Sequence, residues 1–264
     1  MKYKIKKVAV LGSGVMGSGI ACHLANVGLE VLMLDILPKD IKNKNARNSV
    51  ADGALEKAIK SKPSPLYRKS FVKYIKTGNF EDDFEKISEA DWIIEVVVEL
   101  LDIKRKIFES VEKHRKPGSL VTSNTSSIPI SILAKDRSDD FKEHFCGTHF
   151  FNPPRYMRLL EIIPSNDSKA EMIDFFMQFG SDILGKQTVL CKDTTAFIAN
   201  RIGVMSGCKI FQLTEKYDMT IEEVDAITGT LIGRPNTASY RLQDLVGLDT
   251  SDKVTNFVVE NAKG

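Results

Sequence analysis

The chain has 264 residues, 42% of them hydrophobic, which suits one large globular domain or two of ordinary size. Its 37 basic and 35 acidic residues nearly balance, and this argues against a surface built to bind nucleic acid. No apolar run approaches the roughly 18 residues that cross a bilayer, and the basic start leads directly into a strand pattern rather than a signal-peptide core. We therefore expect a globular protein with no nucleic-acid partner and no membrane insertion.

The cysteines are widely scattered and form no Cys-x-x-Cys pair, which is unlike both a zinc site and a disulfide scaffold. We expect reduced thiols, a cytoplasmic location, no metal, and burial of the four side chains as small hydrophobes. The four are Cys22, Cys146, Cys191 and Cys208.

The first part of the chain alternates between strand and helix patterns. Residues 7–12 form an apolar run that ends in glycine, residues 15–27 carry apolar side chains at helical spacing, and residues 30–35 are again apolar. This order predicts a βαβ unit. Residues 39–76 are rich in lysine and mostly helical in pattern, so we expect them to project as a helical appendage.

The alternation resumes after residue 78. The pattern predicts strands at 92–99, 119–124, 145–151, 159–163 and 187–191, and helices at 102–114, 129–134 and 169–184. Strands that alternate with helices indicate an α/β fold with a Rossmann-type, doubly wound, mainly parallel sheet.

Beyond residue 192 only helical periodicity remains, at 195–217, 220–231 and from 237 onward. We therefore predict a dinucleotide-binding domain at 1–192 and a smaller all-helical domain at 193–264. The last helical pattern has no terminating element, so we expect this domain to be incomplete and the chain to be a fragment. Its exposed apolar surface would include Phe257, Val258 and residues 245–248.

A glycine-rich loop follows the first strand and opens the first helix, and an acidic residue ends the next strand, as a dinucleotide-binding fingerprint requires. The glycines permit a tight turn, the approach of a pyrophosphate to the backbone, and close packing of helix on strand. Asp35 would accept hydrogen bonds from the adenosine ribose and repel a 2′-phosphate, which favours NAD over NADP. The loop residues are Gly12, Ser13, Gly14, Val15, Met16 and Gly17.

His149 lies at or just past the end of a predicted strand, where open α/β sheets bind ligands. Glu161 is the one carboxylate inside the apolar run 159–163, and a buried carboxylate needs a cation or a donor nearby. We predict that it pairs with His149, which could then remove a hydroxyl proton. Pairing of Glu161 with Arg158 or another cation is the alternative.

Two further polar groups have open interpretations. Ser126 follows the strand at 119–124, where its hydroxyl could bond a substrate oxygen or the nicotinamide ribose, or could cap the next helix. Asn200 lies in the first helix of the second domain, where its amide could face a cleft between domains or simply the solvent.

Taken together, these stretches resemble the L-3-hydroxyacyl-CoA dehydrogenases of fatty-acid β-oxidation. The matching segments run in family order over nearly the whole chain, and they are residues 12–21, 94–99, 123–127, 148–153, 160–163, 192–194, 197–201 and 246–249. The resemblance implies NAD-dependent oxidation of (S)-3-hydroxyacyl-CoA to 3-oxoacyl-CoA, or the reverse reaction.

The resemblance also implies roles for single residues. His149 would be the general base and Glu161 its partner, with Ser126 and Asn200 orienting the 3-oxygen of the substrate. Residues that would join the glycine loop and Asp35 in holding NAD are Glu99, Lys104, Ser126 and Asn152. The appendage would hold the CoA tail, for which Lys57 and Lys60 match the family only loosely.

Residues 233–237 depart from the usual Gly-Pro-rich turn of the family. With residues 152–156, they look closer to the dehydrogenase part of long fused β-oxidation enzymes. The resemblance thus implies either a homodimer through the helical domain or a partner domain within a longer protein. Two alternatives to the dehydrogenase function remain: a related enzyme that oxidises a sugar acid, and a module that senses NADH without chemistry.

Overall fold

The computed structural model describes residues 3–39 and 46–261, except for a few side chains near the C-terminal end. The chain divides into two compact units, residues 1–193 and 194–264. The break falls one residue from the boundary predicted at 192.

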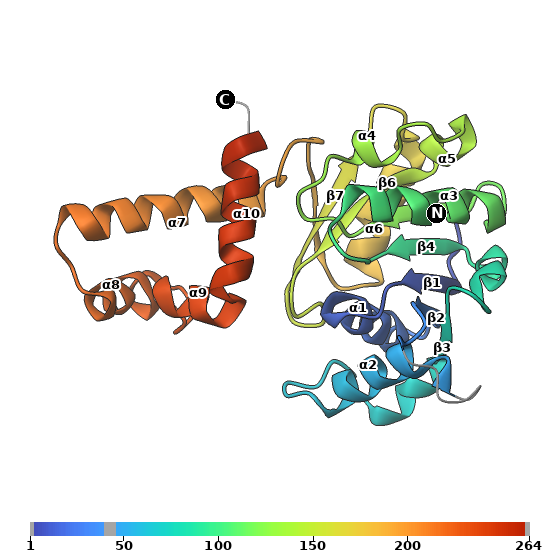
Figure 1. Cartoon of the computed structure of the whole chain (residues 1–264), viewed down its shortest axis with the longest axis horizontal. Helices are drawn as coiled ribbons and strands as arrows, with labels where there is room; N and C mark the ends of the chain where they lie inside the picture. The colour runs from blue at the N-terminus through green and yellow to red at the C-terminus, as the bar shows by residue number, and fades with distance from the viewer. Residues whose placement is uncertain (1–2, 40–45, 262–264) are drawn as a thin grey trace. The chain divides into compact units, whose positions relative to one another are not determined.

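An eight-stranded sheet forms the first unit, in the order β3-β2-β1-β4-β5-β6-β7-β8 (Figure 1). Every neighbouring pair is parallel except β6 and β7, which are antiparallel. The predicted doubly wound, mainly parallel sheet is therefore confirmed. The strands are β1 (Lys7–Leu11), β2 (Glu30–Asp35), β3 (Ile75–Asn79), β4 (Trp92–Glu95), β5 (Leu120–Ser123), β6 (Phe145–Phe150), β7 (Leu159–Pro164) and β8 (Gln187–Leu190).

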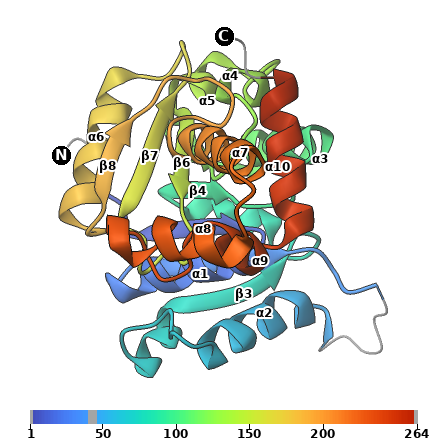
Figure 2. The same ribbon diagram turned by 90° about the vertical axis from the view of Figure 1, so that its left-hand side faces the viewer.

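Helices cover both faces of this sheet, because alternate residues of a strand point to opposite sides. Cys146 of β6 belongs to the core cluster that also contains apolar side chains of α1 and α6, whereas its neighbour Phe145 packs against Phe108 of α3. Helices α3 and α6 accordingly lie on opposite sides of the sheet (Figure 1 and Figure 2). The helices of this unit are α1 (Val15–Asn26), α2 (Ser49–Lys60), α3 (Leu101–His114), α4 (Ile130–Leu133), α5 (Asp139–Glu143) and α6 (Ala170–Asp182), with 3-10 turns η2 (Lys69–Tyr74) and η3 (Phe84–Glu89).

The appendage differs from its prediction. Its described residues contain the helix α2 and the turn η2, and then β3, a strand that the helical interpretation missed. This strand is the outer neighbour of β2 and reads Ile-Lys-Thr-Gly-Asn, because an edge strand needs few apolar side chains. Residues 40–45 lie outside the described part of the chain.

Two other elements are shorter than predicted. The strand predicted at 92–99 ends at Glu95, where the sheet gives way to a loop. The helix predicted from residue 195 begins at Ala199, because Ala196 and Phe197 have φ angles of 60° and 49°, which a right-handed helix cannot contain.

Within the described residues of the second unit, helices joined by turns and loops are the regular structure, as predicted. Leu245, Val246 and Leu248 are exposed, as expected for an apolar surface, but Val258 is buried, so its predicted exposure is wrong. The side chain of Phe257 lies outside the described residues. The elements are α7 (Ala199–Lys216), α8 (Ile221–Thr228), η4 (Thr230–Ile232), α9 (Tyr240–Val246) and α10 (Leu248–Asn261).

None of the helices within residues 3–39 and 46–261 combines the length and apolarity that crossing a bilayer requires. Within the same residues no three His, Cys, Asp or Glu side chains are grouped to hold a metal ion. None of the four cysteines, all of which the structure describes, forms a disulfide; Cys208 is half-buried and the other three are buried.

A buried histidine in α1 makes the stability of the fold sensitive to acid. His23 is 2% exposed, and its Nε2 lies 3.1 Å from the carbonyl oxygen of Leu184, while Nδ1 has no hydrogen-bond partner. Burial, helped by the positive charges of Lys186 and Arg155, lowers the pKa of His23 from 6.5 to about 4. The folded protein therefore resists a proton that the unfolded chain accepts.

We expect the free energy of unfolding to fall as the pH drops from about 6.5 towards 4, by up to about 3 kcal/mol from this group. Urea unfolding at a series of pH values measures the loss. His23→Gln removes the titration but keeps a donor for Leu184, so its profile should be flatter in this range. Identical slopes for the variant and the parent would show that His23 does not set the acid sensitivity.

Candidate active site

The glycine-rich loop connects β1 to α1 at the carboxyl edge of the sheet. Gly12 has a φ of 105°, and its amide donates to the carbonyl oxygen of Leu34 in β2 at 2.8 Å. A Cβ at Gly17 would lie 1.9 Å from the carbonyl oxygen of Gly12, whereas a Cβ at Gly14 would meet nothing within 4 Å. The loop is thus packed tightly at Gly12 and Gly17 and open at Gly14, which suits the approach of a pyrophosphate to the helix N-terminus.

Asp35, at the end of β2, binds this loop through hydrogen bonds to Ser13. Its Oδ2 accepts hydrogen bonds from the amide and the hydroxyl of Ser13, at 2.6 and 2.5 Å, and its Oδ1 accepts from the amide of Ile36 at 2.7 Å. The side chain therefore lies beside the loop, at the strand end where the fingerprint places the adenosine ribose.

Asp35 is expected to make the protein select NAD over NADP. A carboxylate next to a 2′-phosphate costs electrostatic energy that should weaken NADPH binding at least about tenfold relative to NADH. Fluorescence titrations with the two reduced cofactors measure the ratio, and Asp35→Asn should bring the two affinities closer. Equal affinities for the unaltered protein would exclude this role for Asp35.

His149 and Glu161 form a buried cross-strand pair. They face each other in the antiparallel register of β6 and β7, and Nδ1 of His149 lies 2.7 Å from Oε2 of Glu161. The side chains of His149 and Glu161 are 6% and 1% exposed. The ring centres of His149 and Phe151 are 4.4 Å apart. The predicted pairing of Glu161 with His149 is present, while the alternative partner Arg158 is exposed. A carboxylate on Nδ1 fixes the orientation and the tautomer of the imidazole.

A second carboxylate, Glu99, accepts several hydrogen bonds from the loop that follows β5. Its Oε1 accepts from the hydroxyl of Thr125 at 2.5 Å, from the amide of Ser126 at 3.0 Å, and from the amide and hydroxyl of Ser127 at 3.1 and 3.0 Å. Burial acts to raise the pKa of Glu99, but the charge of Lys104 and these hydroxyl groups outweigh it and hold the pKa below its usual range. The backbone at Ser126 is therefore set by an ionised side chain.

Beneath Glu99 lies a buried ion pair that the sequence interpretation did not identify. The ammonium of Lys104 is 2.7 Å from Glu95 and 3.1 Å from Glu99, and its side chain is 1% exposed. Burial alone would lower the pKa of Lys104, yet the two carboxylates raise it. Glu95 also accepts from Ser123 at 2.5 Å and from the amide of Val97 at 2.7 Å, although its complete burial still raises its pKa.

These contacts refine what Lys104 can do. Because its ammonium is enclosed by two carboxylates, a direct contact with NAD stays a prediction, and the structure shows Lys104 acting on Glu99. The signal for Glu95 was present in the sequence, since it is one carboxylate inside the apolar run 92–98, as Glu161 is in its own run.

The remaining predicted residues are less constrained. Asn152 is exposed in the loop after β6. Asn200 lies in the first turn of α7, in the second unit, so its approach to His149 stays a prediction. Asn124, to which no role was assigned, accepts from the amide of Phe150 at 2.8 Å and so ties the ends of β5 and β6 together.

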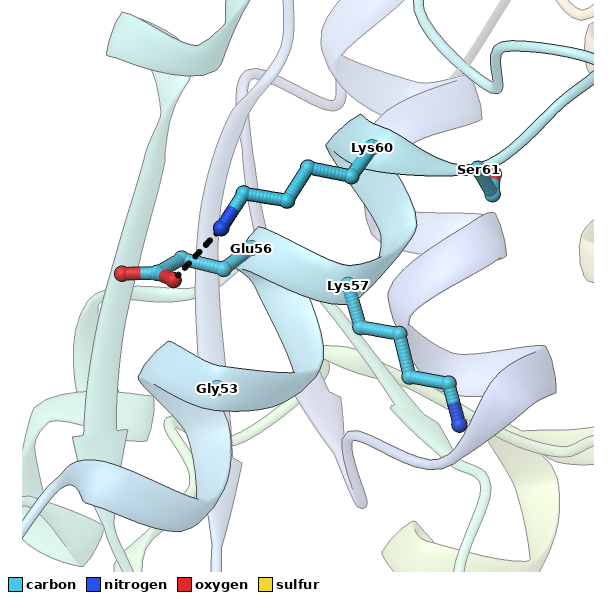
Figure 3. Close-up of a pocket in the computed structure, with 5 residues that line it drawn as sticks. All are labelled: Gly53, Glu56, Lys57, Lys60 and Ser61. Atoms are coloured by element: carbon cyan, nitrogen blue, oxygen red, sulfur yellow. Dashed lines mark hydrogen bonds and ion pairs between the residues drawn. The ribbon is translucent and has the colours of Figure 1, made fainter.

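Lys57 and Lys60 line a cavity of about 490 Å³ along α2, together with Gly53, Glu56 and Ser61 (Figure 3). Lys60 pairs with Glu56 at 3.3 Å, and Lys57 extends away from that pair. The helix packs beside β2 and β3, whereas His149 is on β6, so β1, β4 and β5 lie between them. A ligand that touched both places would have to be long.

Known proteins match the chain along its whole length. The sequence matches the profile of the NAD-binding domain of 3-hydroxyacyl-CoA dehydrogenase over residues 7–194, and that of the C-terminal domain of the same enzyme over residues 197–264. A probable 3-hydroxyacyl-CoA dehydrogenase of Bacillus subtilis is 50% identical over the full chain, which spans 35% of that protein. One of Deinococcus radiodurans is 44% identical over 97% of the chain and 73% of its own length.

Solved structures agree in fold. The (S)-3-hydroxybutyryl-CoA dehydrogenase PaaH1 of Ralstonia eutropha superposes with a TM-score of 0.79 at 27% identity, covering 98% of this chain and 88% of that one. The structure of FadB2 of M. tuberculosis gives the same TM-score at 29% identity, covering 97% and 87%.

Proposed function

Because this chain belongs to the 3-hydroxyacyl-CoA dehydrogenase family, we propose that it oxidises (S)-3-hydroxyacyl-CoA to 3-oxoacyl-CoA in fatty-acid β-oxidation. The observation that carries this proposal is the buried contact of 2.7 Å between His149 and Glu161, in the same sheet as an open dinucleotide loop. A module that only sensed NADH would need no such pair.

His149 is the general base in this proposal. Oxidation of the hydroxyl breaks the O–H and C3–H bonds, and Nε2 of the imidazole takes the hydroxyl proton. Glu161, bonded to Nδ1, stabilises the imidazolium that results. Ser126 and Asn200 form hydrogen bonds to the 3-oxygen of the substrate and hold it in the orientation that the forming carbonyl requires. When bound, NAD supplies the acceptor for the hydride that leaves C3.

The chain offers a cradle for NAD along the carboxyl edge of β1, β2 and β4. The space at Gly14 and the start of α1 suit the pyrophosphate, and Asp35 suits the adenosine ribose. Glu99 and Asn152 lie beyond the point where the strand order reverses, on the side that receives the nicotinamide half. The proposed set is Gly12, Ser13, Gly14, Val15, Met16, Gly17, Asp35, Glu99, Lys104, Ser126 and Asn152.

We assign the CoA tail to the cavity on α2. Lys57 and Lys60 are exposed there, and ammonium groups attract the phosphates of the nucleotide. Strands in a sheet are roughly 4.8 Å apart, so a thioester at β6 and phosphates beside β2 require an extended linker of four strand spacings. The pantetheine arm of CoA is such a linker.

Assembly and location complete the proposal. A Rickettsia felis protein that is 40% identical to this chain is named as a putative trifunctional enzyme of fatty-acid oxidation. We propose that the helical unit packs against a second copy or against another part of a longer protein, which would cover Leu245 and Leu248. We place the protein in the cytoplasm, where cysteines that form no disulfide, as the four described here, stay reduced.

The decisive assay follows NADH oxidation at 340 nm with acetoacetyl-CoA as the acceptor. Turnover that saturates with the thioester supports the proposal. Tight NADH binding without turnover would instead indicate a sensor, and turnover of a sugar acid with NAD but not of the thioester would indicate the alternative dehydrogenase.

A further inference from the structure

The loop between β6 and β7 makes a long-range contact that the proposed reaction does not explain. This loop, residues 151–158, starts two residues after His149 and ends before β7, which carries Glu161. Its residues Arg155 and Tyr156 reach the segment 61–67, about 90 positions earlier in the chain. That segment directly follows α2, the helix that carries Lys57 and Lys60.

Arg155 is the centre of the contact. Its Nη1 donates to the carbonyl oxygens of Ser64 and Leu66, at 2.6 and 3.1 Å. The guanidinium lies 4.4 Å from the ring centre of Tyr67 and 4.9 Å from that of Tyr156, and the hydroxyl of Tyr156 donates to Ser64 at 3.0 Å. A planar cation between two rings is held in one orientation, which a lysine ammonium would not reproduce.

The other end of the same loop is also held in place. The ammonium of Lys186, which is 5% exposed, donates to the carbonyl oxygens of Pro154 and Met157. A Cβ added to Gly19 of α1 would lie 3.0 Å from the ring of Pro154, so the loop also packs closely on α1. The loop that carries Arg155 is therefore held in place at its other end. The hydrogen bonds of Arg155 to the segment 61–67 can then fix the position of that segment relative to the loop.

The helix α2 buries few of its own side chains, so the contacts of the segment that follows it matter for its position. Only Ala51 and Leu55 are buried, and in the last turn Ala58 and Ile59 are half-buried while Lys57 and Lys60 are exposed. Beyond it, the side chain of Asn26 in α1 donates to the carbonyl oxygen of Pro65 at 2.9 Å and accepts from the amide of Tyr67 at 2.8 Å. Asn26 and Arg155 thus both hold the segment 61–67 through hydrogen bonds to its backbone.

We infer that Arg155 is a positioning residue for the CoA end of the substrate: it fixes the C-terminal end of α2, with its two lysines, relative to the strand that carries His149. This inference rests on the proposed function and on the assignment of the CoA tail to α2. Arg155 touches neither the reacting atoms nor the cofactor in this account. It sets the distance between the place that holds the nucleotide and the place that reacts.

A comparison of two substrates tests the inference. Acetoacetyl-CoA carries the nucleotide, whereas acetoacetyl-pantetheine has the same reacting group and arm without it. Arg155→Ala should raise KM for the CoA thioester roughly 5–20-fold, the worth of charged hydrogen bonds, and leave kcat nearly unchanged. The same variant should have unaltered kcat/KM for the pantetheine thioester and unaltered NADH affinity.

Matched variants separate this role from simple damage to the fold. Arg158→Ala removes an exposed arginine of the same loop and should behave as the parent protein on both substrates. Asn26→Ala removes the other side chain that bonds the backbone of the segment 61–67, and it should repeat the selective rise in KM. If Arg155→Ala does not fold, Arg155→Lys and Asn26→Ala still decide the matter.

Three results would overturn the inference. Equal losses on both thioesters would show a structural role, and no loss on either would show no role. An unchanged KM for acetoacetyl-CoA in the double variant Lys57→Ala/Lys60→Ala would remove the site that Arg155 is said to position. A parent protein that turned over neither thioester would instead refute the proposed function.

Discussion

Replacing His149 with Gln is expected to lower turnover of acetoacetyl-CoA by roughly 10²–10⁴-fold, the usual contribution of a positioned general base. Gln can still donate a hydrogen bond to Glu161 across the two strands, so the buried carboxylate keeps a partner and the sheet keeps its register. NADH affinity should change little, because the glycine loop lies on β1 and not on β6. Steady-state rates and a binding titration measure the two quantities on one preparation.

His144→Gln is the matched control for this variant. That histidine is also buried, lies five residues earlier, and has its Nδ1 2.8 Å from the carbonyl oxygen of Asp140. It should retain near-normal turnover. If the His149 variant keeps most of its activity, or if both variants lose activity equally, the base is elsewhere.

Replacing Gly17 with Ala should destabilise the protein by about 2–4 kcal/mol, because the added methyl group meets backbone that cannot retreat. Its Cβ would lie 1.9 Å from the carbonyl oxygen of Gly12, and Gly12 is itself fixed by its bond to Leu34 and by the nearby backbone of Val96. NADH affinity should fall as well, since the helix start moves away from the loop. Urea unfolding and titration with NADH measure both losses.

Gly14→Ala separates the two effects. A Cβ there meets nothing within 4 Å, and the residue has a φ of −54°, which any residue adopts. The stability of this variant should stay within about 1 kcal/mol of the parent. Its NADH affinity should nevertheless fall, because the methyl group occupies the approach of the pyrophosphate. A stable Gly17 variant, or a Gly14 variant with full affinity, would contradict this view of the loop.

The alternation of apolar runs with helical periodicity was enough to predict the sheet, because central parallel strands are buried on both faces and must be apolar. It was not enough for β3. That strand has one neighbour only, so a lysine, a threonine and a glycine are tolerated in it and the apolar signal disappears. The first helix of the second unit begins later than predicted, because the φ angles of Ala196 and Phe197 do not fit a right-handed helix.

Part of the candidate site could likewise be predicted from the sequence, and part could not. Glu161 could be predicted to need a partner from its place in an apolar strand, and the structure supplies His149. The same reasoning applies to Glu95, which was overlooked because its partner Lys104 lies in the helix after the strand, among other charged residues.

Arg155 had no comparable signal. Its partners are backbone carbonyl oxygens, which every residue carries, and the segment that offers them is about 90 residues away. Only the folded chain brings the loop and the segment together. Positioning contacts of this kind are therefore missed by motif analysis, although single catalytic pairs are found by it.

A double-mutant cycle on His149 and Glu161 tests the central claim most directly. Glu161→Gln alone should lower kcat/KM for acetoacetyl-CoA, because the imidazolium loses its counter-charge. The double variant His149→Gln/Glu161→Gln should lie within roughly threefold of His149→Gln alone, since residues that act as one unit are not additive. If the two single losses multiply in the double variant, Glu161 and His149 act separately, and the buried pair is not the proton-transfer unit of this enzyme.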